Sequence, residues 1–226
     1  MNAMQAIRRG PLDAYLASRA TGWFPIADGA AATHLADEFV EAARLAAVAL
    51  CDLSALPKLC VKGPSAADWL RGQGLEAPAE MYAAAPLADG GLAIRTGGSE
   101  FFLESGLSAR SVPELDARLA AAPTGCYRVE RQDATLLVCG PKSPVLFAQT
   151  CGLELAAMPS RRLIYTRVAG VNCGIWPEEI GTRPAYRLWC DASYAKSLWE
   201  SLEEIAVELD GGAVGALAVF PQLEGE

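Results

Sequence analysis

The sequence predicts an α+β fold with two pseudo-repeated lobes, each running strand, helix, strands, helix around a mainly antiparallel sheet. The first observation is a repeated phrase, LCVKGP at residues 59–64 and LLVCGP at residues 136–141. The second is that both copies continue through an apolar helix to Gly-Leu-Glu, at residues 74–76 and 152–154. The third is a nearly constant offset, since Leu136 lies 77 residues after Leu59 and Leu153 lies 78 after Leu75. A duplicated structural unit explains this agreement better than chance.

Residues 1–54 are expected to form a helical lead before the first lobe. Leu12, Tyr15 and Leu16 have the i, i+3, i+4 spacing of a short amphipathic helix. A longer helix is expected over residues 35–50, with its small apolar face packed against another element and its charged face in water. The apolar face comprises Phe39, Ala42, Ala43, Ala46 and Ala49, and the charged face comprises Asp37, Glu38, Glu41 and Arg44.

The first lobe is expected over residues 55–122. A strand at residues 59–61 leads through Gly63-Pro64 into a helix capped by Ser65. Residues 92–95 and 101–103 are expected to pair as a hairpin around Gly97-Gly98. A second helix follows and ends before Pro123.

The second lobe, residues 123–226, repeats that order. A strand at residues 134–139 leads into a helix that begins at Ser143-Pro144. Further strands are expected at residues 163–168, 171–176 and 186–190. The spacing of Leu198, Leu202 and Ile205 marks one face of a closing helix.

Composition limits the classes of partner. The chain has 226 residues, 52% of them hydrophobic, with a net charge of −8 and a pI near 4.8. Nucleic-acid binding needs clustered Lys and Arg, which are dispersed here, so no nucleic-acid partner is expected. No run of about twenty apolar residues is free of charge, and no apolar stretch follows Arg8 and Arg9. We therefore expect no membrane span and no signal peptide, and place the protein in the cytoplasm.

Cysteine and histidine usage gives no sign of a metal site. Seven cysteines without a C-x-x-C pair are spread through strand-like segments, which predicts buried thiols rather than disulfides. His34 is the only histidine. Because the sequence places no Ser or Cys partner beside it, we expect an ordinary residue of a loop or helix start.

The order of several short motifs resembles the glycine-cleavage T-protein (aminomethyltransferase) superfamily of folate-binding proteins. These motifs are E-A-A-R at residues 41–44, D-L-S at 52–54, V-K-G-P at 61–64, D-G-G-L at 89–92, V-C-G-P at 138–141 and V-G-A at 214–216. The resemblance runs in order along about residues 10–226. It implies a single T-protein-like domain that lacks the C-terminal barrel domain of the full enzymes.

Within that superfamily the chain most resembles the gamma subunit of heterotetrameric sarcosine oxidase. The motifs are R-G-P-L at residues 9–12, L-E-A-P at 75–78, E-F-F-L at 100–103 and C-G-L-E-L at 151–155. This resemblance implies that the partners are other subunits of a flavin-dependent amine oxidase complex. It also implies tetrahydrofolate as a ligand, with no cofactor bound tightly by this chain alone.

Several chemical groups that the family uses are missing. Work on tetrahydrofolate needs a carboxylate near the reacting amine and another that accepts paired hydrogen bonds from the pterin. The resemblance implies two aspartates where this chain has Ile94 and Arg95, and a glutamate close to where it has Arg183. It also implies an arginine where this chain has Pro221 or Gln222. An arginine cannot accept the hydrogen bonds that a carboxylate accepts. The sequence therefore argues against aminomethyl transfer, and we assign no catalytic residue.

Glu178 and Glu179 are the candidate folate-binding residues, as displaced pterin carboxylates. The alternative is a solvated hairpin loop, because a Pro/Glu/Gly cluster between two strands is typical of one. Asp52 and Ser54 also have two interpretations, as site residues or as strand-end groups that satisfy backbone donors.

The favoured hypothesis is a non-catalytic accessory subunit of a sarcosine-oxidase-like complex that couples N-methyl amine oxidation to tetrahydrofolate. The alternative is a stand-alone folate-dependent one-carbon transferase or demethylase with a rearranged site anchored by Glu178 or Glu179. A third hypothesis is a binding module that holds another small ligand at the seam between the lobes.

Overall fold

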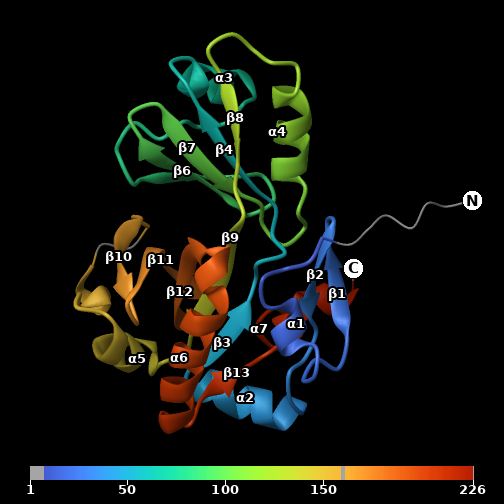
Figure 1. Ribbon diagram of the computed structural model, residues 1–226, viewed down its shortest axis with the longest axis vertical. Helices are drawn as coiled ribbons and strands as arrows, with labels where there is room; N and C mark the ends of the chain where they lie inside the picture. The colour runs from blue at the N-terminus through green and yellow to red at the C-terminus, as the bar shows by residue number, and fades with distance from the viewer. Residues whose placement is uncertain (1–7, 159–160, 226) are drawn as a thin grey trace, which may run out of the picture. The chain divides into compact units, whose positions relative to one another are not determined.

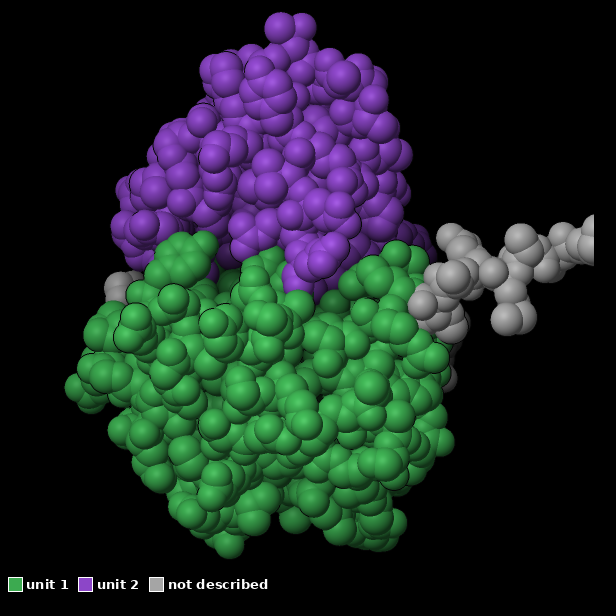
Figure 2. Space-filling view, viewed as in Figure 1, with its two compact units in different colours: residues 1–55, 133–160, 164–226 green, residues 56–132, 161–163 purple. Residues whose placement is uncertain are grey.

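The computed structural model describes residues 8–158 and 161–225. Residues 1–7, which belong to the N-terminal stretch where no signal peptide is expected, lie outside the described residues. The chain divides into two compact units (Figures 1 and 2). Unit 1 comprises residues 1–55, 133–160 and 164–226, and unit 2 comprises residues 56–132 and 161–163. The expected lead, residues 1–54, thus belongs to the same unit as most of the expected second lobe.

Unit 1 is built on a six-stranded sheet. In spatial order its strands are β10 (Ile164–Val168), β11 (Val171–Ile180), β12 (Arg183–Asp191), β9 (Asp133–Cys139), β3 (Ala49–Asp52) and β13 (Gly212–Ala213). Neighbouring strands are antiparallel, except that β13 runs parallel to β3. The early strand β3 therefore lies between two strands from the second half of the chain.

Helices α1 (Asp13–Leu16), α5 (Ser143–Thr150) and α6 (Ala195–Glu208) share one hydrophobic core with the unit 1 sheet. Alternate residues of the strands, such as Leu136 and Val138, point from the sheet into this core. Trp199 of α6 is fully buried in it. The ring of Phe147 on α5 meets that of Tyr186 on β12 edge-on, with centroids 4.8 Å apart. The remaining elements of unit 1 are β1 (Trp23–Ile26), β2 (Gly29–Ala32), α2 (Glu38–Ala47), α7 (Ala216–Val219) and the 3-10 turns Leu155–Ala157, Ala192–Tyr194 and Pro221–Gly225.

Unit 2 is built on a five-stranded antiparallel sheet. In spatial order its strands are β5 (Ala84–Pro86), β6 (Leu92–Gly97), β7 (Glu100–Glu104), β4 (Lys58–Lys62) and β8 (Tyr127–Glu130). Helices α3 (Ala66–Gly72) and α4 (Ser111–Leu119) share a core with alternate residues of the sheet, including Leu59, Val61, Phe101 and Leu103. The hairpin expected around Gly97-Gly98 is confirmed as β6 and β7.

The repeated phrase forms the same structure in both units. Strands β4 and β9 each pair with the second strand of a hairpin, β7 or β12, and each runs into a glycine of positive φ, 130° at Gly63 and 119° at Gly140. A Cβ at Gly63 would collide with the carbonyl oxygen of Gly125, and one at Gly140 would lie 2.6 Å from that of Ala47. In both copies this carbonyl oxygen accepts the N–H group two residues beyond the glycine. Glycine is therefore required at both positions by φ and by space.

Two local expectations are wrong. Helix α2 is shorter than residues 35–50, because the Asp37 side chain caps its start by accepting the Phe39 N–H and Val48 is extended at its end. The next four residues form β3 instead. Helix α3 begins at Ala66, and the Ser65 side chain makes no capping hydrogen bond.

Candidate functional site

Glu178 and Glu179 lie within strand β11, in the part that pairs with β12. The loop interpretation is therefore wrong, because the hairpin turns only at Gly181 and Thr182. Successive side chains of a strand point to opposite faces of the sheet. The two carboxylates consequently cannot bind one edge of the same ligand together.

Glu178 is held by Arg187 of the neighbouring strand. Arg187 Nε donates to Glu178 Oε1 at 3.1 Å and Nη2 donates to Oε2 at 3.2 Å. Both side chains are largely buried, with 20% of Glu178 and 11% of Arg187 exposed. This two-bond contact uses the same carboxylate edge that a pterin would need. Glu179 is exposed on the other face.

The positions where the resemblance expects carboxylates carry side chains with other roles. Ile94 is fully buried in β6. Arg95 lies over the Phe101 ring, and its guanidinium donates to backbone carbonyl oxygens of residues 78–79 and 97–98. Arg183 is exposed at the first position of β12. Arg95 thus joins the 78–79 segment to the β6–β7 turn, and neither arginine offers an acceptor.

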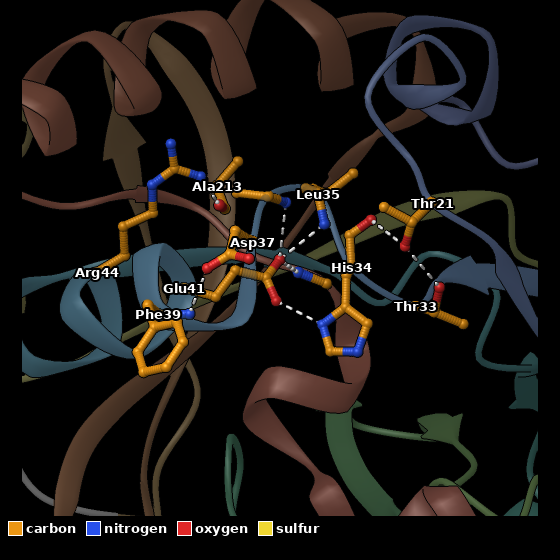
Figure 3. Close-up of polar contacts among 11 residues, drawn as sticks. Thr21, Thr33, His34, Leu35, Asp37, Phe39, Glu41, Arg44 and Ala213 are labelled. Carbon is orange, nitrogen blue, oxygen red and sulfur yellow. Dashed lines mark hydrogen bonds and ion pairs between the residues drawn. The ribbon is translucent and has the colours of Figure 1, made fainter.

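A polar cluster that the sequence analysis missed surrounds Glu41 in unit 1 (Figure 3). Glu41 is fully buried, whereas the helical pattern predicted that it would face water. Its Oε1 accepts the N–H groups of Leu35 at 2.7 Å, Ala36 at 3.3 Å and Gly215 at 2.8 Å. Its Oε2 shares a hydrogen bond of 2.7 Å with Nδ1 of His34, in the loop before α2. We call these five residues the Glu41 cluster.

The Glu41 cluster brings together two motifs that carry the family resemblance, E-A-A-R and V-G-A. Besides the Glu41–Gly215 contact, Arg44 Nη1 donates to the carbonyl oxygen of Ala213 at 2.6 Å. A Cβ at Gly215 would collide with the carbonyl oxygen of Thr33. Both motifs therefore join helix α2 to the β13–α7 segment. In the sequence, the signal for the contact between α2 and the β13–α7 segment is the E-x-x-R pattern of Glu41 and Arg44, which follows His34, the only histidine.

Unit 2 contains a buried ion pair that the sequence analysis also missed. Lys58 Nζ lies 3.5 Å from Glu104 Oε2, and the two side chains are 3% and 0% exposed. Lys58 Nζ also donates to the carbonyl oxygen of Leu56 at 2.9 Å. The two residues are direct partners in the β4–β7 ladder. Because an unpaired buried charge is costly, this pair opposes any slip of the β4–β7 register.

Asp52 and Ser54 act as strand-end groups that satisfy backbone donors. Asp52 Oδ1 accepts the N–H of Ser54 at 2.9 Å, and Ser54 Oγ accepts the N–H of Thr135 at 3.1 Å. These contacts join β3 to β9 inside unit 1, which supports the second of the two interpretations.

The cysteines are free thiols, and all but Cys151 are buried, as the sequence predicts. Burial raises the pKa of Cys139, Cys173 and Cys190 to about 12 in each case. Because the thiolate is the nucleophile, these three residues are unsuited to covalent catalysis. Across residues 8–158 and 161–225, no group of three or more His, Cys, Asp or Glu residues is placed to hold a metal ion. In that same part of the chain, every helix is too short or too polar to span a membrane.

Comparison with solved structures identifies the fold of this chain. No family model and no curated protein matches the sequence. The glycine cleavage system aminomethyltransferase T from Bartonella henselae matches the structure with a TM-score of 0.73 at 15% identity, over 94% of this chain and 61% of that one. The chain has a T-protein-like fold. It spans about three fifths of the length of that aminomethyltransferase.

A second solved structure matches this T-protein-like fold along nearly its whole length. A chain of heterotetrameric sarcosine oxidase from Corynebacterium sp. U-96 has a TM-score of 0.65 at 19% identity. The match covers 91% of this chain and 97% of that one. The fold expected from the resemblance is thus confirmed, and its similarity extends to sarcosine oxidase.

Proposed function

We propose that this T-protein-like chain is a non-catalytic accessory subunit of a cytoplasmic, sarcosine-oxidase-like complex that couples N-methyl amine oxidation to tetrahydrofolate. The observation that carries the proposal is the extent of the structural match. The match covers 91% of this chain and 97% of its sarcosine oxidase counterpart. The partners we propose are the flavin-containing subunits of such a complex.

The side chains in the expected folate positions support a role without aminomethyl transfer. Ile94, Arg95 and Arg183 offer no carboxylate, and Glu178 is already bound by Arg187. For Glu178 to accept the paired hydrogen bonds of a pterin, Arg187 would have to release it. Ile94, Arg95, Arg183 and the Arg187-bound Glu178 therefore do not fit the pterin edge, and we derive no folate step on this chain alone.

Co-purification tests the proposed function directly. The full chain, tagged and expressed in its native source, is isolated under mild conditions, and bound flavin is read from its absorbance. We expect flavin-containing chains to accompany it in constant ratio and the complex to oxidise an N-methyl amine. Isolation of the chain alone, without flavin, would refute the proposal.

The alternative, a stand-alone folate-dependent transferase or demethylase, is favoured by the higher TM-score of the aminomethyltransferase match. Calorimetric titration of the isolated chain with tetrahydrofolate distinguishes the two functions. We expect no heat of binding at millimolar ligand. Saturable binding that is lost in Glu178→Gln or Glu179→Gln, with Glu200→Gln as an exposed control, would favour the alternative.

A further inference from the structure

Helix α2 turns a mainly apolar face to solvent, while Glu41, Leu45 and Ala47 face the protein. Phe39 is 88% exposed and Val40 is 43% exposed. Ala42, Ala43 and Ala46 are exposed as well. The sequence pattern predicted that the apolar residues of this face would be packed and that Glu41 would face water, and both predictions are wrong. Asp37 and Glu38 do face water, as predicted. We call the five exposed apolar residues the α2 face.

The Glu41 cluster fixes this orientation. Glu41 makes four polar contacts from the inward side of α2, and Arg44, one helical turn further on, reaches the carbonyl oxygen of Ala213. Figure 3 shows Glu41 pointing toward His34 while Phe39 lies outside the cluster. Rotating the helix to bury the α2 face would break all of these contacts and expose three backbone N–H groups. The α2 face is therefore held in solvent by the fold.

The α2 face has the chemistry of a docking surface. Its members at 39, 42, 43 and 46 follow the i, i+3, i+4, i+7 spacing and form one stripe along the helix. The alanines allow another backbone to approach closely, and Phe39 is a projecting aromatic side chain of the kind that anchors an interface. Contiguous exposed apolar surface of this sort marks interaction sites on soluble proteins.

The charges around the α2 face indicate which partner it suits. Asp37 and Glu38 are exposed at its N-terminal end, and the Glu38 carboxylate has no hydrogen bond or ion pair within the described residues. At the other end Lys142 Nζ lies 2.8 Å from Asp210, and the Arg44 guanidinium donates to the carbonyl oxygen of Ala213. The N-terminal end of this surface is therefore the acidic one. A complementary surface carries Lys or Arg opposite Asp37 and Glu38.

A second copy of this chain fits the α2 face poorly. Two copies would each carry a net charge of −8 and the same acidic rim. Helix α2 has ten residues, so it is about 15 Å long. A contact between two such helices would fall well short of the roughly 800 Å² that each partner buries in a stable interface. The helix suits one part of a larger contact with a different chain.

We infer that the α2 face docks a different protein chain, whose binding surface is an apolar cleft bordered by Lys or Arg. This inference rests on the proposed function, because it names the surface through which the chain joins its complex. Phe39 enters the cleft, the alanines allow close helix contact, and Glu38 pairs with a basic residue at the rim.

Photo-crosslinking from the α2 face tests the inference. A photoreactive amino acid replaces Val40 in the tagged full chain, and the cross-linked peptides are sequenced after irradiation of the native complex. We expect the cross-link to join a different chain at a segment with Lys or Arg beside apolar residues. A cross-link to a second copy of this chain, or no protein cross-link at all, would overturn the inference whether or not flavin-containing chains co-purify.

Matched variants separate this inference from the proposed function. Ala43→Arg places a large charged side chain on the α2 face, Glu38→Lys reverses the rim charge, and Val145→Arg alters an exposed valine of helix α5. We expect Ala43→Arg to weaken partner recovery at least about tenfold. Glu38→Lys should weaken it and reduce its dependence on salt. Val145→Arg should leave it unchanged, and all three should retain the wild-type circular dichroism and melting temperature.

Full recovery of the flavin-containing chains by a folded Ala43→Arg variant would refute the docking surface and leave the proposed function standing. Absence of those chains from the wild-type preparation would refute the proposed function, while the cross-link still decides whether the α2 face docks another protein.

Discussion

Removing the Glu41 carboxylate tests whether the Glu41 cluster holds helix α2 in place. In Glu41→Ala, the N–H groups of Leu35, Ala36 and Gly215 lose their acceptor in a buried site. Each unsatisfied buried donor costs about 1–3 kcal/mol, and water entering the vacated space recovers part of that. We expect the free energy of unfolding to fall by about 3–5 kcal/mol, similar to the range found when one partner of a buried ion pair is removed.

Two companion variants separate hydrogen bonding from other effects. Glu41→Gln keeps a side-chain oxygen for the three N–H groups, so we expect a loss of only about 1–2 kcal/mol. Glu38→Ala removes an exposed carboxylate from the same helix and should change the free energy of unfolding by less than about 0.5 kcal/mol. Urea titrations followed by circular dichroism and tryptophan fluorescence measure all three variants.

We expect the loss of stability to be largest in Glu41→Ala, smaller in Glu41→Gln and smallest in Glu38→Ala. If Glu41→Ala were no more costly than Glu38→Ala, the cluster would not stabilise the fold. If Glu41→Gln were as costly as Glu41→Ala, the negative charge rather than the accepted hydrogen bonds would be the stabilising feature.

Three further predictions concern other parts of the fold. Gly140→Ala should lower the free energy of unfolding by at least about 2 kcal/mol, because φ is 119° and a carbonyl oxygen lies 2.6 Å from the new Cβ. Gly152→Ala, where the new Cβ has open space around it, is the control in the same urea titration. Burial raises the pKa of Asp89, but hydrogen bonds, led by that from the backbone N–H of Ser111, leave the pKa below its usual value. Its contribution to stability is therefore present at neutral pH and lost as the pH falls through the folded-state pKa, and Asp89→Asn should show less acid destabilisation than wild type between pH 7 and acidic pH. Cys151, the half-exposed cysteine, should react first with a thiol reagent in the native state, and mass spectrometry that finds a buried cysteine labelled earlier would contradict the described burial.

Much of the fold could be predicted because strand and turn signals are local. The repeated phrase marked both repeats through Gly63 and Gly140, since a residue with positive φ and no room for Cβ must be glycine. The β6–β7 hairpin likewise follows from two apolar runs around Gly97-Gly98. Loop residues were harder to place, because β11 and β12 continue past the apolar pattern and take Glu178 and Glu179 into the sheet.

The candidate site residues show why side-chain roles were less predictable than elements. Composition around Glu178 is typical of a solvated turn, but its partner Arg187 lies on the next strand and is revealed only by the β11–β12 register. Glu104 and Lys58 are separated by 46 residues of sequence and are also brought together by a ladder. Sequence spacing carries no information about such pairs until the register is known.

The sequence by itself determined the two repeats, the strand–Gly-Pro–helix order and the buried thiols, because these depend on backbone conformation and on hydrophobicity along short stretches. Only the tertiary structure decided which way helix α2 faces. Its periodicity defines an apolar side and a charged side equally well in either orientation. The donors that turn Glu41 inward come from Leu35 and from Gly215, at opposite ends of the chain, so the fold must bring them together before Glu41 can be buried.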